Sequence, residues 1–142
     1  MTTTVRDPIT PLPARRTRTR VLGVAGATLA ALAVWIIAVP IAGIDLLVRP
    51  GSGSPQIVGA GTVLAASLIA SFLGWVLLSV LEHHTAGARR VWTAVAVAVL
   101  LLSLGGPLSA GTTILVKVTL SLMHVAVGAV LITALRRSSP TG

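Results

Sequence analysis

The chain has 142 residues, of which 54% are hydrophobic and 10% are charged. Its mean hydropathy of +0.96 excludes an ordinary soluble domain and indicates an integral membrane protein. The sequence contains no cysteine, which excludes disulfides, thiolate metal sites and cysteine nucleophiles. The net charge of +8 does not indicate nucleic-acid binding, because every Lys and Arg except Lys117 lies outside the apolar runs and no nucleic-acid-binding module accompanies them.

Residues 1–20 form a basic segment, rich in proline and threonine, ahead of the first apolar run. Such a composition cannot bury enough apolar surface to fold, so it predicts a disordered cytoplasmic tail. The first predicted membrane helix covers residues 21–39, and Pro40 is expected to end it or to bend its last turn. Residues 44–56 then form a polar connector rich in turn residues, with Asp45 as its single acid.

The second predicted helix covers residues 57–81 and carries no charged side chain. Ser67 and Ser71 lie near one face of this helix, and that face is expected to pack inward. Residues 82–90 follow as a short polar loop that begins with Glu-His-His. This sequence does not indicate a metal site, because adjacent residues of a helix point about 100° apart and no His-x-x-x-His pair accompanies them.

The third predicted helix, residues 91–108, is interrupted by Gly105-Gly106-Pro107. Only about 14 residues precede the interruption, which is roughly 21 Å of helix against a hydrocarbon core of about 30 Å. We therefore expect the helix to continue through the break. Pro107 has no N–H to donate to the Ser103 carbonyl, so that carbonyl is expected to be free near one end of the span.

The fourth predicted helix, residues 112–135, alone carries ionisable side chains at membrane depth. Lys117, Ser121, His124 and Gly128 recur at steps of four, three and four residues, which places them on one stripe of a helix. Because lipid solvates such groups poorly, we expect the stripe to face other helices or a wet cavity.

Lys117 and His124 each have a structural and a functional interpretation. The Lys117 ammonium either reaches the nearer membrane surface along its flexible stem, or is buried against the Ser103 carbonyl and Asp45. His124 lies too deep to reach the surface, and its commonest role would be a neutral imidazole hydrogen-bonded across the bundle to a serine of the second helix or to a carbonyl. The candidate intramembrane polar site therefore comprises Lys117, Ser121, His124, Ser103, Asp45, Ser67 and Ser71.

The basic residues predict how the helices are oriented. Arginines cluster in residues 1–20, 82–90 and 136–137, whereas the other connectors carry only Arg49. Because basic connectors remain cytoplasmic, both termini are expected on the cytoplasmic side of a plasma membrane. The sequence thus predicts an all-α, integral membrane four-helix bundle over residues 21–137, with residues 138–142 as a short tail.

Short motifs follow one another along the chain in an order that is typical of one family. They are Pro40 with Gly43-Ile44-Asp45-Leu46, Gly74-Trp75, Leu81-Glu82, Trp92, Ser103-Leu104-Gly105-Gly106-Pro107 and Met123-His124. The chain resembles a family of short four-span bacterial membrane proteins, common in actinobacteria, that is catalogued only as a domain of unknown function. The resemblance extends from the first predicted helix to Arg137. It implies four spans in a plasma membrane and supplies no substrate, cofactor or catalytic residue.

Two classes of function fit the sequence. The first is a non-enzymatic envelope or assembly component in the lipid bilayer, whose polar stripe fixes helix packing and association with a second copy or another membrane protein. The second is a small transporter or proton-coupled carrier, in which His124 titrates at mid-membrane and Lys117 holds an anionic group. Enzyme activity is not expected, because the sequence has no Ser/His/Asp arrangement, paired carboxylates or phosphate-binding loop. No cofactor or metal is predicted.

Overall fold

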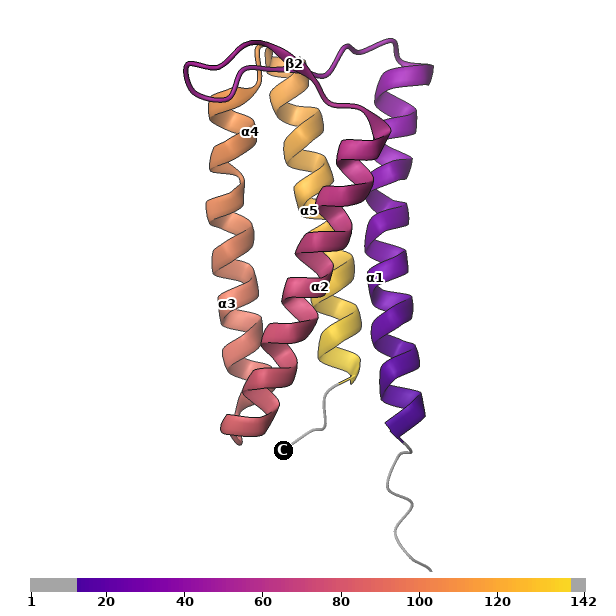
Figure 1. The fold of residues 1–142 in the computed structure, drawn as a ribbon, viewed down its shortest axis with the longest axis vertical. Helices are drawn as coiled ribbons and strands as arrows, with labels where there is room; N and C mark the ends of the chain where they lie inside the picture. The colour runs from indigo at the N-terminus through magenta and orange to yellow at the C-terminus, as the bar shows by residue number, and fades with distance from the viewer. Residues whose placement is uncertain (1–12, 139–142) are drawn as a thin grey trace, which may run out of the picture.

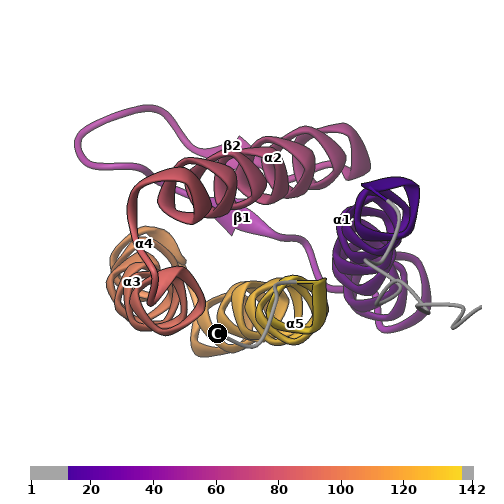
Figure 2. The ribbon, with the colours of Figure 1, turned by 90° about the horizontal axis from the view of Figure 1, so that it is seen from below.

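The computed structural model describes residues 13–138 of the chain (Figure 1). Within these residues the protein is an all-α bundle of four spans: α1 (Pro13–Ile36), α2 (Ala60–His84), α3 (Ala88–Ser103) continued by α4 (Gly105–Ala110), and α5 (Ile114–Ser138). Viewed along the bundle, the spans form a ring in the order α1, α2, α3, α5 (Figure 2). All four are long and apolar enough to cross a membrane, which confirms the predicted fold class.

The outer surface of the bundle is apolar along most of its length. Large side chains that are more than half exposed occur on every span, for example Leu29, Phe72, Leu102 and Leu122. At most 28% of the most apolar stretch of any span is buried inside the bundle. An apolar surface of this extent is not stable in water. The bundle is therefore a multi-pass membrane protein whose outer faces require lipid or protein to cover them.

Helix α1 begins at Pro13, not at Val21, so residues 13–20 are helical and do not belong to a disordered tail. Proline suits the first turn of a helix, because its φ is already helical. The N–H that it lacks would have no hydrogen-bond acceptor within the helix at this position. The alanine and arginines that follow are good helix formers. Arg20 also packs between α2 and α5, which gives this turn a tertiary contact that composition does not reveal. The remaining predicted tails, residues 1–12 and 139–142, lie outside the described residues.

Pro40 lies in the π-helical turn η1 (Ile37–Ile41) that follows α1. Its ring has no N–H to donate to the helix, and the backbone relaxes into the wider turn, in which the Ala42 N–H donates to the Ile37 carbonyl at 2.9 Å. Gly43 follows with a φ of +66°, a left-handed conformation that favours glycine. The chain thereby leaves α1 and crosses the end of the bundle.

The connector between α1 and α2 is more ordered than the polar loop predicted for it. It forms a short antiparallel hairpin of β1 (Leu47–Val48) and β2 (Gln56–Ile57), with Leu47 opposite Ile57 and Val48 opposite Gln56. Leu46, just before β1, is fully buried in the core. We call this end of the bundle the hairpin end, and the opposite end the basic end, because the latter carries Arg20, Arg89, Arg90, Arg136 and Arg137.

The third span is interrupted near Gly105 but not ended there. Helix α3 stops at Ser103, Leu104 forms a turn, and α4 carries the span on to Ala110. The Leu108 N–H donates to the Leu104 carbonyl at 3.2 Å, which restarts helical bonding beyond Pro107. Residues 88–110 thus make one span of 23 residues, long enough for a bilayer.

The core consists of two apolar clusters, one above the other along the bundle axis. The cluster nearer the hairpin end contains Ala31, Leu46, Val63, Val116, Leu120 and Met123. The cluster nearer the basic end contains Ala27, Leu78, Trp92, Leu131 and Leu135. Helices α1, α2 and α5 contribute to both, whereas the hairpin segment supplies Leu46 to the first and α3 supplies Trp92 to the second. The hairpin segment therefore completes the core at the hairpin end, and α3 completes it at the basic end.

Candidate functional site

The hydroxyls and the imidazole predicted to form an intramembrane site bind mainly to their own helices. The Ser67 hydroxyl donates to the Leu64 carbonyl at 3.0 Å, and the Ser103 hydroxyl donates to the Leu100 carbonyl at 2.7 Å. The Ser71 and Ser121 hydroxyls are buried and have no hydrogen-bond partner in the described part of the chain. These four serines therefore do not join one helix to another.

His124 is not hydrogen-bonded across the bundle, contrary to the prediction. Its Nδ1 lies 2.8 Å from the carbonyl oxygen of Leu120, one turn earlier in α5. Because a carbonyl can only accept, this contact requires the hydrogen on Nδ1. The ring is half-buried. Its Nδ1 is satisfied within α5 and requires no hydrogen-bond partner on another helix.

Lys117 and Asp45 do not form an ion pair, which was one of the two alternatives for the lysine. Among residues 16–138, whose side chains are described, the single ion pair joins Arg20 to Glu82. Asp45 is exposed on the connector that crosses the hairpin end. The aliphatic stem of Lys117 packs instead against Gly111, where an added Cβ would lie 2.6 Å from the lysine Cγ. The lysine therefore lies along the turn between α4 and α5, close to the hairpin end.

The polar stripe of α5 faces the third span and not the bundle centre. All four of its residues are half-buried, whereas the buried face of α5 carries Val116, Leu120, Met123, Leu131 and Leu135. A Cβ added to Gly128 would lie 2.7 Å from Cδ2 of Leu100 on α3. The stripe thus lies beside the core, where Gly128 lets α3 approach closely.

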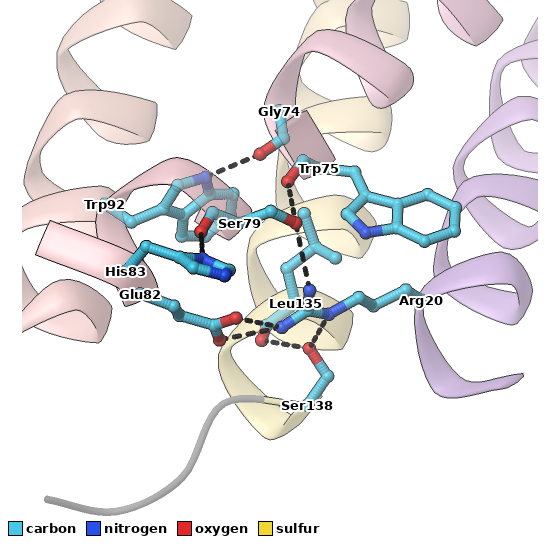
Figure 3. A network of polar contacts seen from close by, with 9 residues as sticks. All are labelled: Arg20, Gly74, Trp75, Ser79, Glu82, His83, Trp92, Leu135 and Ser138. Atoms are coloured by element: carbon cyan, nitrogen blue, oxygen red, sulfur yellow. Dashed lines mark hydrogen bonds and ion pairs between the residues drawn. The ribbon is translucent and has the colours of Figure 1, made fainter. Parts of the chain in front are cut away.

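Polar side chains converge at the basic end, around Arg20 (Figure 3). This residue extends from α1 toward α2 and α5 and is 7% exposed. Its Nη2 donates to both carboxylate oxygens of Glu82 at 2.7 Å. Its Nη1 donates to Ser79 Oγ and its Nε to Ser138 Oγ, each at 3.2 Å. One guanidinium therefore joins three helices, and we call these four residues the Arg20 network.

The two serines of the Arg20 network are oriented by bonds of their own. Ser79 Oγ donates to the Trp75 carbonyl at 3.0 Å, and Ser138 Oγ donates to the Leu135 carbonyl at 2.8 Å. A hydroxyl that has donated its hydrogen still has lone pairs with which to accept. Both hydroxyls consequently present acceptors to the guanidinium, as a cation requires.

Trp92 belongs to the core cluster nearer the basic end. It is 1% exposed, and its indole Nε1 donates to the Gly74 carbonyl of α2 at 2.9 Å. Gly74 leaves room here, since an added Cβ would lie 3.2 Å from Leu131 Cδ2. The indole thus fastens α3 to α2 at the basic end, near the Arg20 network (Figure 3).

The Arg20 network holds charge but presents no unoccupied reactive group. Both Glu82 oxygens accept from Arg20, and both hydroxyls donate to carbonyls. His83 and His84 are exposed and contact carbonyls of their own helix at 2.7 Å and 3.0 Å. The described residues contain no group of three His, Cys, Asp or Glu side chains that could hold a metal. The geometry of the Arg20 network suits the association of the three helices that it joins.

Sequence reasoning missed this network because it assigned Arg20 to a tail and Glu82 to a wet loop. A usable signal was nevertheless present. Glu82 is the single acid among the described residues of the basic end, where many arginines lie. An acid in that position is expected to select one of the arginines as its partner, and the arginine nearest an apolar run is best placed to be buried with it.

Comparison with protein-family models gives a match over residues 11–141 to a family of unknown function (DUF6069). The matched region contains all four spans, the hairpin and the Arg20 network. It agrees with the resemblance inferred from the sequence, and a bacterial origin stays a prediction. A search of curated proteins found no match, and a search of solved structures found none either.

Proposed function

The chain belongs to the DUF6069 family of unknown function, and from that premise we propose that it is a non-enzymatic, multi-pass plasma-membrane protein that serves as an envelope or assembly component. Its partner is a second copy or another membrane protein. The observation that carries this proposal is the division of its polar groups. Of those at membrane depth, Ser67, Ser103 and His124 bind their own helices, whereas the network that joins three helices lies at one end, where it stabilises the bundle.

Apolar packing along the bundle axis supports this proposal over the carrier alternative. A carrier needs polar groups that follow one another along a pathway. Here two apolar clusters occupy the interior between the hairpin end and the Arg20 network. The observation that most favours a carrier is that the hydroxyls of Thr28, Ser71 and Ser121 are buried without partners. Such groups are the ones expected to recruit internal water.

The third span is the best candidate for contact with a partner. Its most apolar stretch is 11% buried, whereas those of the other three spans are 22–28% buried. Leu102 on this span is 79% exposed. A span that contributes so little surface to its own bundle leaves most of that surface available for other helices, which associate in lipid by close packing.

Site-specific photo-crosslinking in native membranes tests the assembly role. A photoreactive amino acid is placed at Leu102 on α3 and, as the matched control, at Ile69 on α2, which is 61% exposed. We expect protein adducts from position 102 and predominantly lipid adducts from position 69. Adducts with lipid alone at both positions would contradict the assembly role.

Proton flux in reconstituted vesicles tests the competing carrier function. We expect the purified chain to move no more protons than protein-free vesicles, and His124→Gln to behave in the same way. A pH-dependent flux that His124→Gln abolishes, in a variant that still folds, would replace the assembly role with the carrier.

We also propose that both termini are cytoplasmic. The arginines at the basic end support this orientation through the positive-inside rule. Reporter fusions after Ser54 and Gly111 should then report the outside, and fusions after Gly87 and Arg137 the inside. A cytoplasmic signal from the Ser54 fusion would overturn the orientation.

A further inference from the structure

An open apolar groove of about 440 Å³ lies on α5 near the basic end, and Ala129, Val130, Thr133, Ala134 and Arg137 line it. One edge of the groove, at Val130 and Ala134, adjoins α1. A Cβ added to Gly23 would lie 2.7 Å from the Ala134 Cβ, and one added to Gly26 would lie 3.4 Å from Val130 Cγ1. The two helices therefore pack closely along this edge of the groove, and its hollow lies on the neighbouring face of α5.

The wall of the groove is apolar at membrane depth. The Thr133 hydroxyl donates to the Ala129 carbonyl at 2.7 Å, so its polar atom is already engaged within α5. The other side chains along this part are alkyl groups, and Ala129 and Thr133 are exposed. Such a surface offers dispersion contacts to a chain of methylene groups and no unpaired hydroxyl to a polar ligand.

The groove ends at a cation. Arg137 is exposed and, among the described side chains of residues 16–138, forms no ion pair, in contrast to Arg20. It follows the last apolar turn of a membrane-spanning helix, which puts its guanidinium at the level of lipid headgroups. The groove therefore combines an apolar channel at acyl-chain depth with a positive charge at phosphate depth.

We propose that this groove is a binding site for an anionic phospholipid, with one acyl chain along Ala129 and Thr133 and the phosphate held by Arg137. A guanidinium binds phosphate oxygens through paired, charge-assisted hydrogen bonds. A second copy of the chain fits less well. A two-fold pair formed through this surface within one membrane would place both Arg137 side chains at the same depth, where like charges repel.

Native mass spectrometry of the purified full-length chain tests the site. The chain is mixed with phosphatidylglycerol or with phosphatidylcholine that has the same acyl chains. Arg137→Gln removes the cation, and Ala129→Trp fills the groove from an exposed position that leaves the core intact. Arg90→Gln is the matched control, because it removes an exposed arginine from the same end of the bundle, on α3.

We expect selective retention of phosphatidylglycerol. Its affinity should fall about tenfold for Arg137→Gln, because the variant loses one charge-assisted interaction. We expect a loss of about tenfold for Ala129→Trp too, because the indole occupies the space of the acyl chain. Arg90→Gln should bind like the wild type. Thermal unfolding shows that each variant is folded, and Thr133→Trp replaces Ala129→Trp if the latter is not. Equal retention of both lipids, an equal loss for Arg90→Gln, or unchanged binding after the groove is filled would each overturn the proposal.

Discussion

The two ends of the bundle are closed by different physical means. At the basic end, side chains join the helices, since Arg20 of α1 binds Glu82 and Ser79 of α2 and Ser138 of α5. At the hairpin end, the connections are made mainly by backbone groups. The Arg49 N–H donates to the Ala110 carbonyl at 2.8 Å, and the Val58 N–H donates to the Leu46 carbonyl at 2.9 Å.

This difference determines how each end should respond to substitution. A network centred on one buried cation depends on every partner, because a charge left without its counter-ion has a high free energy away from water. Backbone bonds survive most side-chain changes, and each contributes modestly to stability. The basic end is therefore sensitive to single substitutions, and the hairpin end is tolerant of them.

The largest effect is expected when Glu82 is replaced by alanine. The Arg20 and Glu82 side chains are 9% and 18% exposed, so the variant leaves a buried guanidinium without its carboxylate. We expect the free energy of unfolding to fall by about 3 kcal/mol. Unfolding of the purified chain in mixed detergent and dodecyl sulfate micelles measures this change.

The double variant Arg20→Leu with Glu82→Leu is the control for that prediction. Replacing both ions with apolar side chains leaves no unpaired charge, so stability should return to within about 1 kcal/mol of the wild type. A double variant as unstable as Glu82→Ala would mean that the Arg20 network contributes shape complementarity and not charge pairing.

Two tryptophans allow the ends to be compared with the same substitution. Trp92 donates to the Gly74 carbonyl at 2.9 Å at the basic end, and Trp35 donates to the Val58 carbonyl at 3.0 Å at the hairpin end. Trp92→Phe should cost about 2 kcal/mol, since it removes a hydrogen bond and leaves a cavity in the core. Trp35→Phe, at a half-buried position, should cost about 1 kcal/mol. Equal costs, measured by the same unfolding titration, would remove the proposed difference in sensitivity.

The fold was largely predictable because length and hydropathy report directly on membrane spans. Residues 57–81 and 112–135 were expected to be helical, and all but the first few residues of each range lie in α2 and α5, which begin at Ala60 and Ile114. The start of α1 was not predictable from composition, since a segment rich in arginine and proline is typical of a disordered tail. It is ordered because Pro13 fits a first helical turn and Arg20 finds partners on two other helices.

The polar contacts were much harder to predict than the spans. In lipid, the outer and inner faces of a helix are both apolar, so the sequence carries little information about the rotation of each helix. Lys117, Ser121, His124 and Gly128 do share one stripe, but that stripe faces the third span beside the core. Which side chains meet depends on rotation and tilt, and these are set by packing between small residues such as Gly23 and Ala134.

The smallest effects are expected at the hairpin end, for Lys117→Leu and Asp45→Ala. A buried Lys117–Asp45 pair would make the aspartate substitution costly, because it would strand the ammonium. Asp45 is exposed, however, and Lys117 packs its stem along Gly111 without forming an ion pair among the described side chains. Each substitution should therefore change the free energy of unfolding by less than about 0.5 kcal/mol. A loss near 3 kcal/mol for Asp45→Ala, restored when Lys117→Leu is added, would reveal a charge pair at this end and would make the two ends of the bundle alike.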